Sequence, residues 1–256
     1  MERKELPVGV FDSGVGGISV LRAMTALLPG EDFYFYGDSA NAPYGTKSAA
    51  QVRQLTLEKV LYLRQKGIKA VVIACNTATS AAIAALREAY DDMPVIGIEP
   101  ALKPAIHLGE HPRILVMATP ATVAGEKYHQ LQNRFLDQAQ IIPLGCPGLM
   151  EYVENGILEG PHLEAYLKDL LSDILAEGPL DGVVLGCTHY PFVKESIAAV
   201  VGRQVPLLDG SEGTARELRR RLIQASLQRD RDAGGEVYFE MSDPEKTELA
   251  QRLFHA

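Results

Sequence analysis

The sequence predicts an α/β protein made of two related halves, each built on a mostly parallel sheet. Along the 256 residues, short apolar runs rich in β-branched residues alternate with segments of helical periodicity, which is the pattern of consecutive βα units. The order of these runs occurs twice, and the third run of each copy ends in a cysteine, first Cys75 and then Cys187. We therefore expect two pseudo-twofold-related α/β domains with the active site in the cleft between them.

The first copy contains four apolar runs that we expect to form parallel strands, at residues 8–11, 33–36, 70–74 and 94–98. Helices are expected between them at residues 18–28, 48–67 and 80–90, because of apolar spacing and, in the third, a high alanine content. Uninterrupted apolar strands of this kind are typical of parallel sheets that helices cover on both faces.

The second copy has the same series of elements. Strands are expected at residues 114–117, 138–144, 182–185 and within 205–213, with a long amphipathic helix at 161–177. Matched in order, VFDSG corresponds to LVMATPAT, FYFYGDS to IIPLGCP, VVIACNT to VVLGCTH and VIGIEP to PLLDGSE. Cys75 and Cys187 then fall at equivalent places, 112 positions apart. Ligands bind beyond the carboxyl ends of strands in open α/β sheets, so both thiols should lie where chemistry is usually done.

The end of the chain is expected to return to the first copy. From about Leu208 it contains a helix, a charged turn at residues 230–235, the strand EVYFEM and a short terminal helix. We expect a first domain of residues 1–98 plus 209–256 and a second domain of residues 99–208.

The composition is that of a globular protein without a nucleic-acid or membrane partner. Hydrophobic residues make up 46% and charged residues 23% of the chain. The formal net charge is −8 and the pI is near 5.3, whereas binding to phosphate-rich partners is driven largely by lysine and arginine. No stretch approaches about 18 apolar residues and the N-terminus lacks the apolar core of a signal peptide, so we expect a cytoplasmic protein.

The three cysteines, Cys75, Cys146 and Cys187, are not expected to form a disulfide framework or a metal site. Their number is odd, no CxxC pair is present, and no histidine stands at a zinc-ligand spacing. In a reducing compartment the thiols should stay free, which leaves reactivity or simple burial as their role. We expect Cys146, which has no equivalent partner, to be a packing residue.

Each of the two matched cysteines is followed by short polar side chains suited to holding a carboxylate, Asn76, Thr77 and Thr79 after one and Thr188 and His189 after the other. A thiol just beyond a strand and before a helix lies near unpaired backbone N–H groups, which should lower its pKa from about 8.5 toward neutrality. A thiolate and a thiol on opposite faces of one carbon would remove a proton on one side and return one on the other. That pairing inverts the stereochemistry of the carbon.

Nothing in the sequence requires a cofactor. No lysine follows a strand as a Schiff-base candidate, and no P-loop is present. The glycine-rich FDSGVGGIS has Ser19 where the dinucleotide fingerprint needs its last glycine. We therefore expect chemistry that the protein's own side chains perform.

Six blocks follow one another in a fixed order over residues 8–213: GVFDSGVGG, YGDSANAPYGTKS, ACNTATSAA, GIEP, CPGLMEYVENG and LGCTHYP. Together they resemble the bacterial glutamate racemase family, within the cofactor-independent aspartate/glutamate racemase superfamily. The resemblance implies two α/β domains around a buried cleft and an isomerase that interconverts L- and D-glutamate, supplying D-glutamate for peptidoglycan synthesis. It also implies a homodimer or a monomer–dimer equilibrium.

The resemblance assigns roles to residues in the matching blocks. Cys75 and Cys187 correspond to the two cysteines that serve as thiolate base and thiol acid. Asp12 and His189 correspond to residues that assist proton transfer at Cys75 and Cys187 respectively, and Glu154 to an acidic residue near the second cysteine. The substrate-binding residues that it implies are Asp12, Ser13, Pro43, Tyr44, Gly45, Asn76, Thr77, Thr119, Thr122, Thr188 and His189.

Other interpretations of the same residues stay open at this point. A thiol redox protein would pair Cys75 with Cys187 in a disulfide, and a binding module would keep the anion site without the chemistry. Within the superfamily, aspartate is the rival substrate. Taken alone, Asp12 could be a turn or cap residue, Tyr44 a turn aromatic and His189 a buried structural histidine.

Overall fold

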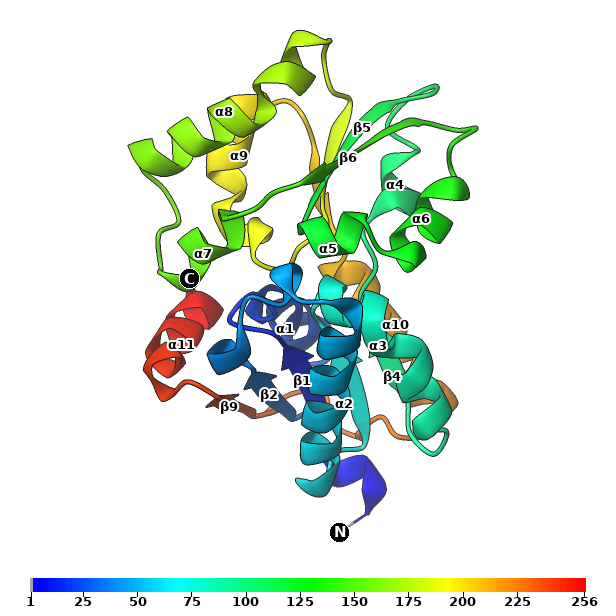
Figure 1. Cartoon of the computed structure of the whole chain (residues 1–256). Helices are drawn as coiled ribbons and strands as arrows, with labels where there is room; N and C mark the ends of the chain where they lie inside the picture. Colours follow the sequence, from blue (N-terminus) through cyan, green and yellow to red (C-terminus); the bar gives the residue numbers. More distant parts are fainter. Residues whose placement is uncertain (1) are drawn as a thin grey trace.

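The strands form two separate sheets in the computed structural model, which describes residues 2–256. The larger sheet contains β1 (Val8–Asp12), β2 (Phe33–Gly37), β3 (Ala70–Ile73), β4 (Val95–Gly97) and β9 (Val237–Met241), in the order β4-β3-β1-β2-β9. The smaller contains β5 (Arg113–Ala118), β6 (Gln140–Gly145), β7 (Gly182–Leu185) and β8 (Leu207–Asp209), in the order β6-β5-β7-β8. All neighbouring strands are parallel. We call each sheet with its helices the large-sheet half and the small-sheet half, the lower and upper parts of Figure 1.

Helices cover both faces of the larger sheet. α1 (Ile18–Leu27), α10 (Ser211–Gln224) and α11 (Thr247–His255) pack on one face, and α2 (Ala49–Gln65) and α3 (Asn76–Ala89) pack on the other. Successive side chains of a strand point to opposite faces, so Val10 of β1 joins the first group and Phe11 the second. Ser48 begins α2 with a capping box to Gln51.

The small-sheet half carries the remaining helices. They are α4 (Leu102–Ala105), α5 (Pro120–Val123), α6 (Glu126–Asn133), α7 (Leu149–Glu154), α8 (Pro161–Ala176) and α9 (Lys194–Val201). α8 is the long helix that the sequence predicts, and its apolar face packs against α9. The short helices α4 to α7 lie in the connections around the rim where the two halves meet (Figure 1).

The two sheets have the same strand order once β9 is set aside. The order β4-β3-β1-β2 corresponds to β8-β7-β5-β6, strand for strand as the sequence copies were matched. The predicted α/β class with two related parallel sheets is confirmed. β9 pairs with β2, and α10 and α11 pack on α1, so the end of the chain does return to the first copy. The domain boundaries at residues 98/99 and 208/209 stay a prediction.

Two sequence-based expectations about the cysteine segments are wrong. α3 begins at Asn76 and not at Ser80, because the Cys75 side chain caps it and Thr79 Oγ1 satisfies the Ile73 carbonyl at 3.1 Å. No α-helix follows Cys187 directly: the 3-10 helix η4 (Tyr190–Val193) comes first, and α9 starts only at its end. Pro191, which lacks an N–H, lies in the first turn of η4.

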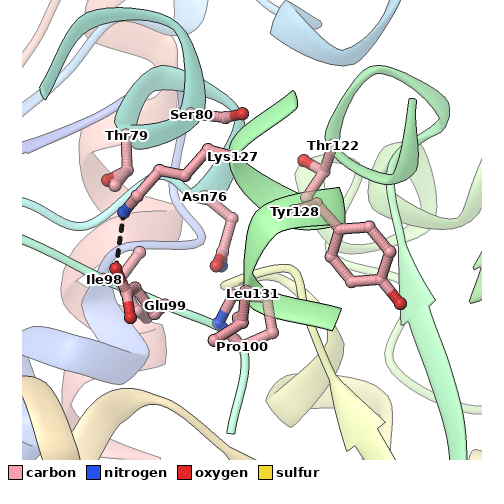
Figure 2. A pocket seen from close by; sticks show the side chains of 10 residues that line it. All are labelled: Asn76, Thr79, Ser80, Ile98, Glu99, Pro100, Thr122, Lys127, Tyr128 and Leu131. Carbon is pink, nitrogen blue, oxygen red and sulfur yellow. Dashed lines mark hydrogen bonds and ion pairs between the residues drawn. The ribbon is translucent and has the colours of Figure 1, made fainter. Parts of the chain in front are cut away.

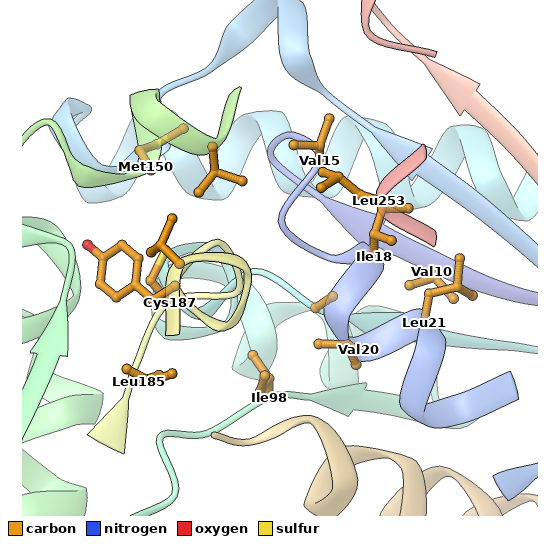
Figure 3. Close-up of a cluster of buried hydrophobic side chains, with 14 of the residues drawn as sticks. Val10, Val15, Ile18, Val20, Leu21, Ile98, Met150, Leu185, Cys187 and Leu253 are labelled. Atoms are coloured by element: carbon orange, nitrogen blue, oxygen red, sulfur yellow. The ribbon is translucent and has the colours of Figure 1, made fainter. Parts of the chain in front are cut away.

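One apolar cluster runs from the large-sheet half into the small-sheet half. It joins Val15 and Ile18 of the large-sheet half to Met150, Leu185 and Cys187 of the small-sheet half (Figure 3). The halves therefore share buried surface around the cysteine segments. Among residues 2–256, no helix combines the length and apolar character needed to cross a membrane.

Candidate active site

Both matched cysteines lie two residues beyond the end of an inner strand. Cys75 follows β3 and Cys187 follows β7, and they expose only 5% and 7% of their surfaces. Cys146 follows β6 and packs in the apolar core, as predicted. All three are free thiols.

The Cys75 thiol lies at the N-terminus of α3, against the end of β1. Its Sγ is 3.4 Å from Ser13 Oγ and accepts a hydrogen bond of 3.4 Å from the Ala78 N–H. Burial, and next the charge of Asp12, raise the pKa of Cys75 to about 12. The expectation of a lowered pKa is therefore wrong for Cys75, because burial opposes the thiolate more strongly than these two hydrogen bonds favour it.

The Cys187 thiol faces an imidazole and a carboxylate instead. Its Sγ is 3.6 Å from His189 Nδ1, and the other ring nitrogen, Nε2, is 2.7 Å from Glu154 Oε1. Burial disfavours the imidazolium, but the contacts with Cys187 and Glu154 outweigh it and raise the pKa of His189 well above 6.5. Burial also disfavours the carboxylate, yet bonding to His189 leaves the pKa of Glu154 lowered. Both shifts favour an imidazolium beside a carboxylate.

Asp12 connects the two cysteine segments. Its carboxylate is fully buried at the end of β1, where Oδ1 accepts a hydrogen bond of 2.9 Å from the Gly14 N–H and Oδ2 accepts one of 3.0 Å from Thr188 Oγ1. Burial raises the pKa of Asp12 to about 6, although the His189 charge and these two hydrogen bonds act in the other direction. The charge of Asp12 thus interacts with both the Cys75 thiol and the His189 ring.

The glycine-rich loop after β1, residues 13–17, packs closely against side chains of the small-sheet half. A Cβ on Gly14 would overlap the Glu154 carboxylate, and a Cβ on Gly16 would overlap the His189 ring and come within 2.6 Å of Thr188 Oγ1. The Val15 N–H donates to Glu154 Oε1 at 2.8 Å, and Ser19 Oγ lies 2.9 Å from the Thr188 carbonyl. The loop therefore accommodates side chains of the other half where a dinucleotide fingerprint would accommodate a pyrophosphate.

Three threonine hydroxyls form a second link between the halves. Thr77 Oγ1 is 2.9 Å from Thr119 Oγ1 and 3.1 Å from Thr122 Oγ1, and the latter two are 2.9 Å apart. Thr77 is the second residue of α3, whereas Thr119 caps α5. Gly45 packs against this group, because a Cβ there would lie 2.8 Å from Thr119 Cβ.

Tyr44 is buried next to the cysteine segment of the large-sheet half. Its hydroxyl donates to Asp38 Oδ2 at 2.7 Å, and burial followed by this hydrogen bond raises the pKa of Tyr44. Pro43, joined to Ala42 by a cis peptide bond, precedes it in the same turn. The structure thus places the predicted residues Pro43, Tyr44 and Gly45 in one loop beside Thr119.

The sequence matches a known family over most of its length. A family model described as Asp/Glu/Hydantoin racemase matches residues 8–218. The chain belongs to this family. The glutamate racemase of Clostridium novyi (strain NT) is 50% identical over 237 residues, which are 93% of this chain and 91% of that protein. The glutamate racemase of Clostridium perfringens (strain SM101 / Type A) is 46% identical over 252 residues, 98% of this chain and 96% of that protein.

Solved structures of racemases have the same fold. Escherichia coli glutamate racemase, in complex with L-glutamate and activator UDP-MurNAc-ala, superposes with a TM-score of 0.85 at 32% identity, covering 97% of this chain and 95% of that one. Francisella tularensis glutamate racemase, in complex with D-glutamate, gives 0.84 at 29% identity, covering 99% and 95%. The resemblance seen in the six sequence blocks is confirmed.

A small pocket lies beside the Cys75 segment, between α3 and α6 (Figure 2). Asn76 and Thr122 line it, and an ion pair of 2.7 Å between Lys127 and Glu99 lies along its wall. Within residues 2–256, Asn76 Oδ1 is buried there without a hydrogen-bond partner. Of the predicted substrate-binding residues, Asn76 is therefore the one whose side chain keeps a buried acceptor free.

Sequence analysis missed three residues of the site. Asp38 and Val15 stand inside the six blocks, but Val15 takes part only through its backbone N–H, so Asp38 alone gave a usable side-chain signal. Ser19 lies two residues beyond the first block. The contacts above link Cys187, His189 and Glu154 directly, reach Asp12 through Thr188, and join Cys75 to Ser13, the residue after Asp12. In the described part of the chain, no three histidine, cysteine, aspartate or glutamate side chains are grouped to hold a metal ion.

Proposed function

We propose that this chain interconverts L- and D-glutamate by two-base proton transfer at the α-carbon, with Cys75 and Cys187 acting on opposite faces and without a cofactor. The observation that carries the proposal is the pair of buried thiols at equivalent strand ends of two matching halves. The high identity to glutamate racemases over nearly the whole chain supports glutamate as the substrate.

In either direction, one thiolate takes the α-proton and the opposite thiol gives its proton to the resulting carbanion. An S–H bond forms on one side as an S–H bond breaks on the other, so turnover exchanges the two roles. The raised pKa of Cys75 means that burial must be offset when this thiolate forms. The ammonium group of glutamate brings a positive charge into the site, and that charge favours a thiolate.

The two thiols receive different assistance in this proposal. His189, which contacts Glu154 through its other ring nitrogen, is the group that exchanges a proton with Cys187. Asp12 and Ser13 serve the Cys75 side. The carboxylates of glutamate bind to the remaining predicted group, which comprises Pro43, Tyr44, Gly45, Asn76, Thr77, Thr119, Thr122 and Thr188. A supply of D-glutamate for peptidoglycan, made in the cytoplasm, is the cellular role that we propose.

The decisive experiment is incubation of the purified protein, without added cofactor, with L-glutamate in deuterated water. Optical activity and the α-proton signal are followed together. We expect optical rotation to decay to zero while deuterium replaces the α-proton. No change in either signal would exclude a racemase of glutamate, and a parallel reaction with aspartate shows which amino acid is the better substrate.

A further inference from the structure

Glu154 is held by the large-sheet half at two separate points. Its carboxylate accepts the Val15 N–H at 2.8 Å while contacting His189 at 2.7 Å. Its main-chain carbonyl accepts a hydrogen bond of 2.7 Å from Lys246 Nζ, although Lys246 lies 92 positions later in the chain. Side chain and backbone of Glu154 are thus both fixed from across the interface.

The Glu154 carbonyl needs a donor from outside its helix. α7 ends at Glu154, and the last carbonyls of a helix have no N–H of the same helix to bond. A cation at this end of a helix also stabilises the helix dipole. The ammonium of Lys246 supplies both a donor and a charge, so a residue of the large-sheet half ends a helix of the small-sheet half.

Lys246 is itself well fixed. β9 pairs with β2 over five residues, and beyond β9 the Ser242 N–H donates to the Gly37 carbonyl at 2.9 Å. The 3-10 helix η5 (Pro244–Lys246) follows, capped by the Asp243 side chain, and Lys246 is its last residue. α11 then lies next to the end of α7 (Figure 1), where a Cβ on Gly156 would come within 2.8 Å of Arg252 Nη2.

We propose that Lys246 is a positioning residue for the reaction. It fixes the end of α7, so that the Glu154 carboxylate stays hydrogen-bonded to His189 and the His189 ring stays in contact with the Cys187 thiol. This inference rests on the proposed racemase function. The Lys246 ammonium bonds the main-chain carbonyl of Glu154 and not its carboxylate, so it acts on His189 through Glu154. The charged or titratable groups around the His189 ring are Cys187, Glu154 and Asp12, and Lys246 adds a positive charge next to Glu154.

The test compares Lys246→Met, which keeps the aliphatic stem, with Lys246→Arg, which keeps a cationic donor. Lys168→Met is the matched control, because Lys168 is an exposed lysine whose ion pair with Glu164 spans 3.9 Å. We expect kcat/KM for glutamate racemisation to fall about tenfold in Lys246→Met, with substantial recovery in Lys246→Arg and no change in Lys168→Met. The His189 ring nitrogens are followed by NMR over pH in each variant.

A positioning role requires that the His189 ring also responds. With Glu154 less well placed, the His189 pKa should fall, and the alkaline limb of kcat/KM should move to lower pH. A loss of activity without this movement would mean that Lys246 only stabilises the fold, and would overturn the proposal. An unchanged kcat/KM in Lys246→Met would overturn it too. If the unsubstituted protein failed to racemise glutamate, the proposed function itself would fall, which the wild-type assay shows separately.

Discussion

Cys75 and Cys187 occupy the same place in two copies of one fold, yet their neighbours differ in kind. Cys75 caps a fourteen-residue helix and has a serine hydroxyl and a buried aspartate beside it. Cys187 precedes a 3-10 helix and has a charged imidazole–carboxylate pair beside it. Repetition of the fold therefore places the two thiols symmetrically, while the loops make their electrostatics unequal.

The different surroundings of the two thiols suit an enzyme that acts on two mirror-image substrates, because the protein itself is chiral. A buried thiol near a carboxylate resists ionisation, whereas an adjacent cation favours the thiolate. In the proposed mechanism each thiol depends on a different charge, Cys75 on that of Asp12 and Cys187 on that of His189. Substitutions near only one of the two thiols should separate the role of Cys75 from that of Cys187.

The largest effect is expected from removing either thiol. Cys75→Ala and Cys187→Ala should each reduce racemisation by about 10³-fold or more, because each removes the proton carrier on one face. Optical rotation measured from both enantiomers, together with deuterium exchange, checks this. Each variant should retain α-proton exchange with at most one enantiomer, and the two variants with opposite ones. A single variant that racemises at the wild-type rate would contradict the two-base mechanism.

A smaller but still large effect is expected from adding a side chain to the glycine-rich loop at the point where His189 packs against it. In Gly16→Ala, the new methyl group overlaps the His189 ring and Thr188, so kcat/KM should fall about 10²-fold while the Cys75 side keeps its contacts. Gly213→Ala in α10 is the control, since a Cβ there meets no atom within 4 Å. Equal activities of the two alanine variants would show that the halves need not approach as closely as the structure has them.

The smallest effect concerns stability and the buried charge of Asp12. Its pKa is raised from 3.8 to about 6 in the folded protein, so Asp12 favours folding below pH 3.8 and this contribution is lost as the pH rises through 6. Asp12→Asn cannot ionise and should be more stable than wild type at pH 8 by about 2 kcal/mol, with no gain near pH 4. Thermal unfolding at both pH values measures this. A gain that does not depend on pH would refute the buried charge as its cause.

The sequence allowed the strands, their duplication and the two cysteine positions to be predicted, because buried parallel strands are local apolar runs. Even the match of β4 with β8 followed from order alone. The start of α3 was missed because threonine has a low helix propensity and because cysteine, which caps the helix here, is not among the residues that usually serve as N-caps. Helix propensity alone does not predict such a cap.

The electrostatics of the site could not be predicted from neighbouring residues in the sequence. The expected lowering of the Cys75 pKa considered the helix N-terminus but not complete burial, which only the packed structure reveals. The contact of Lys246 with Glu154 joins residues 92 positions apart and carries no local pattern. Such links depend on how the halves meet.

The pairing of β9 with β2 has a consequence for the order in which the molecule is made. The small-sheet half is continuous in the chain, so its strands are all available once β8 at Leu207–Asp209 has left the ribosome. The larger sheet begins at Val8 but takes its edge strand from Val237–Met241. The half that is translated first is therefore completed last, and β2 keeps an open edge throughout elongation.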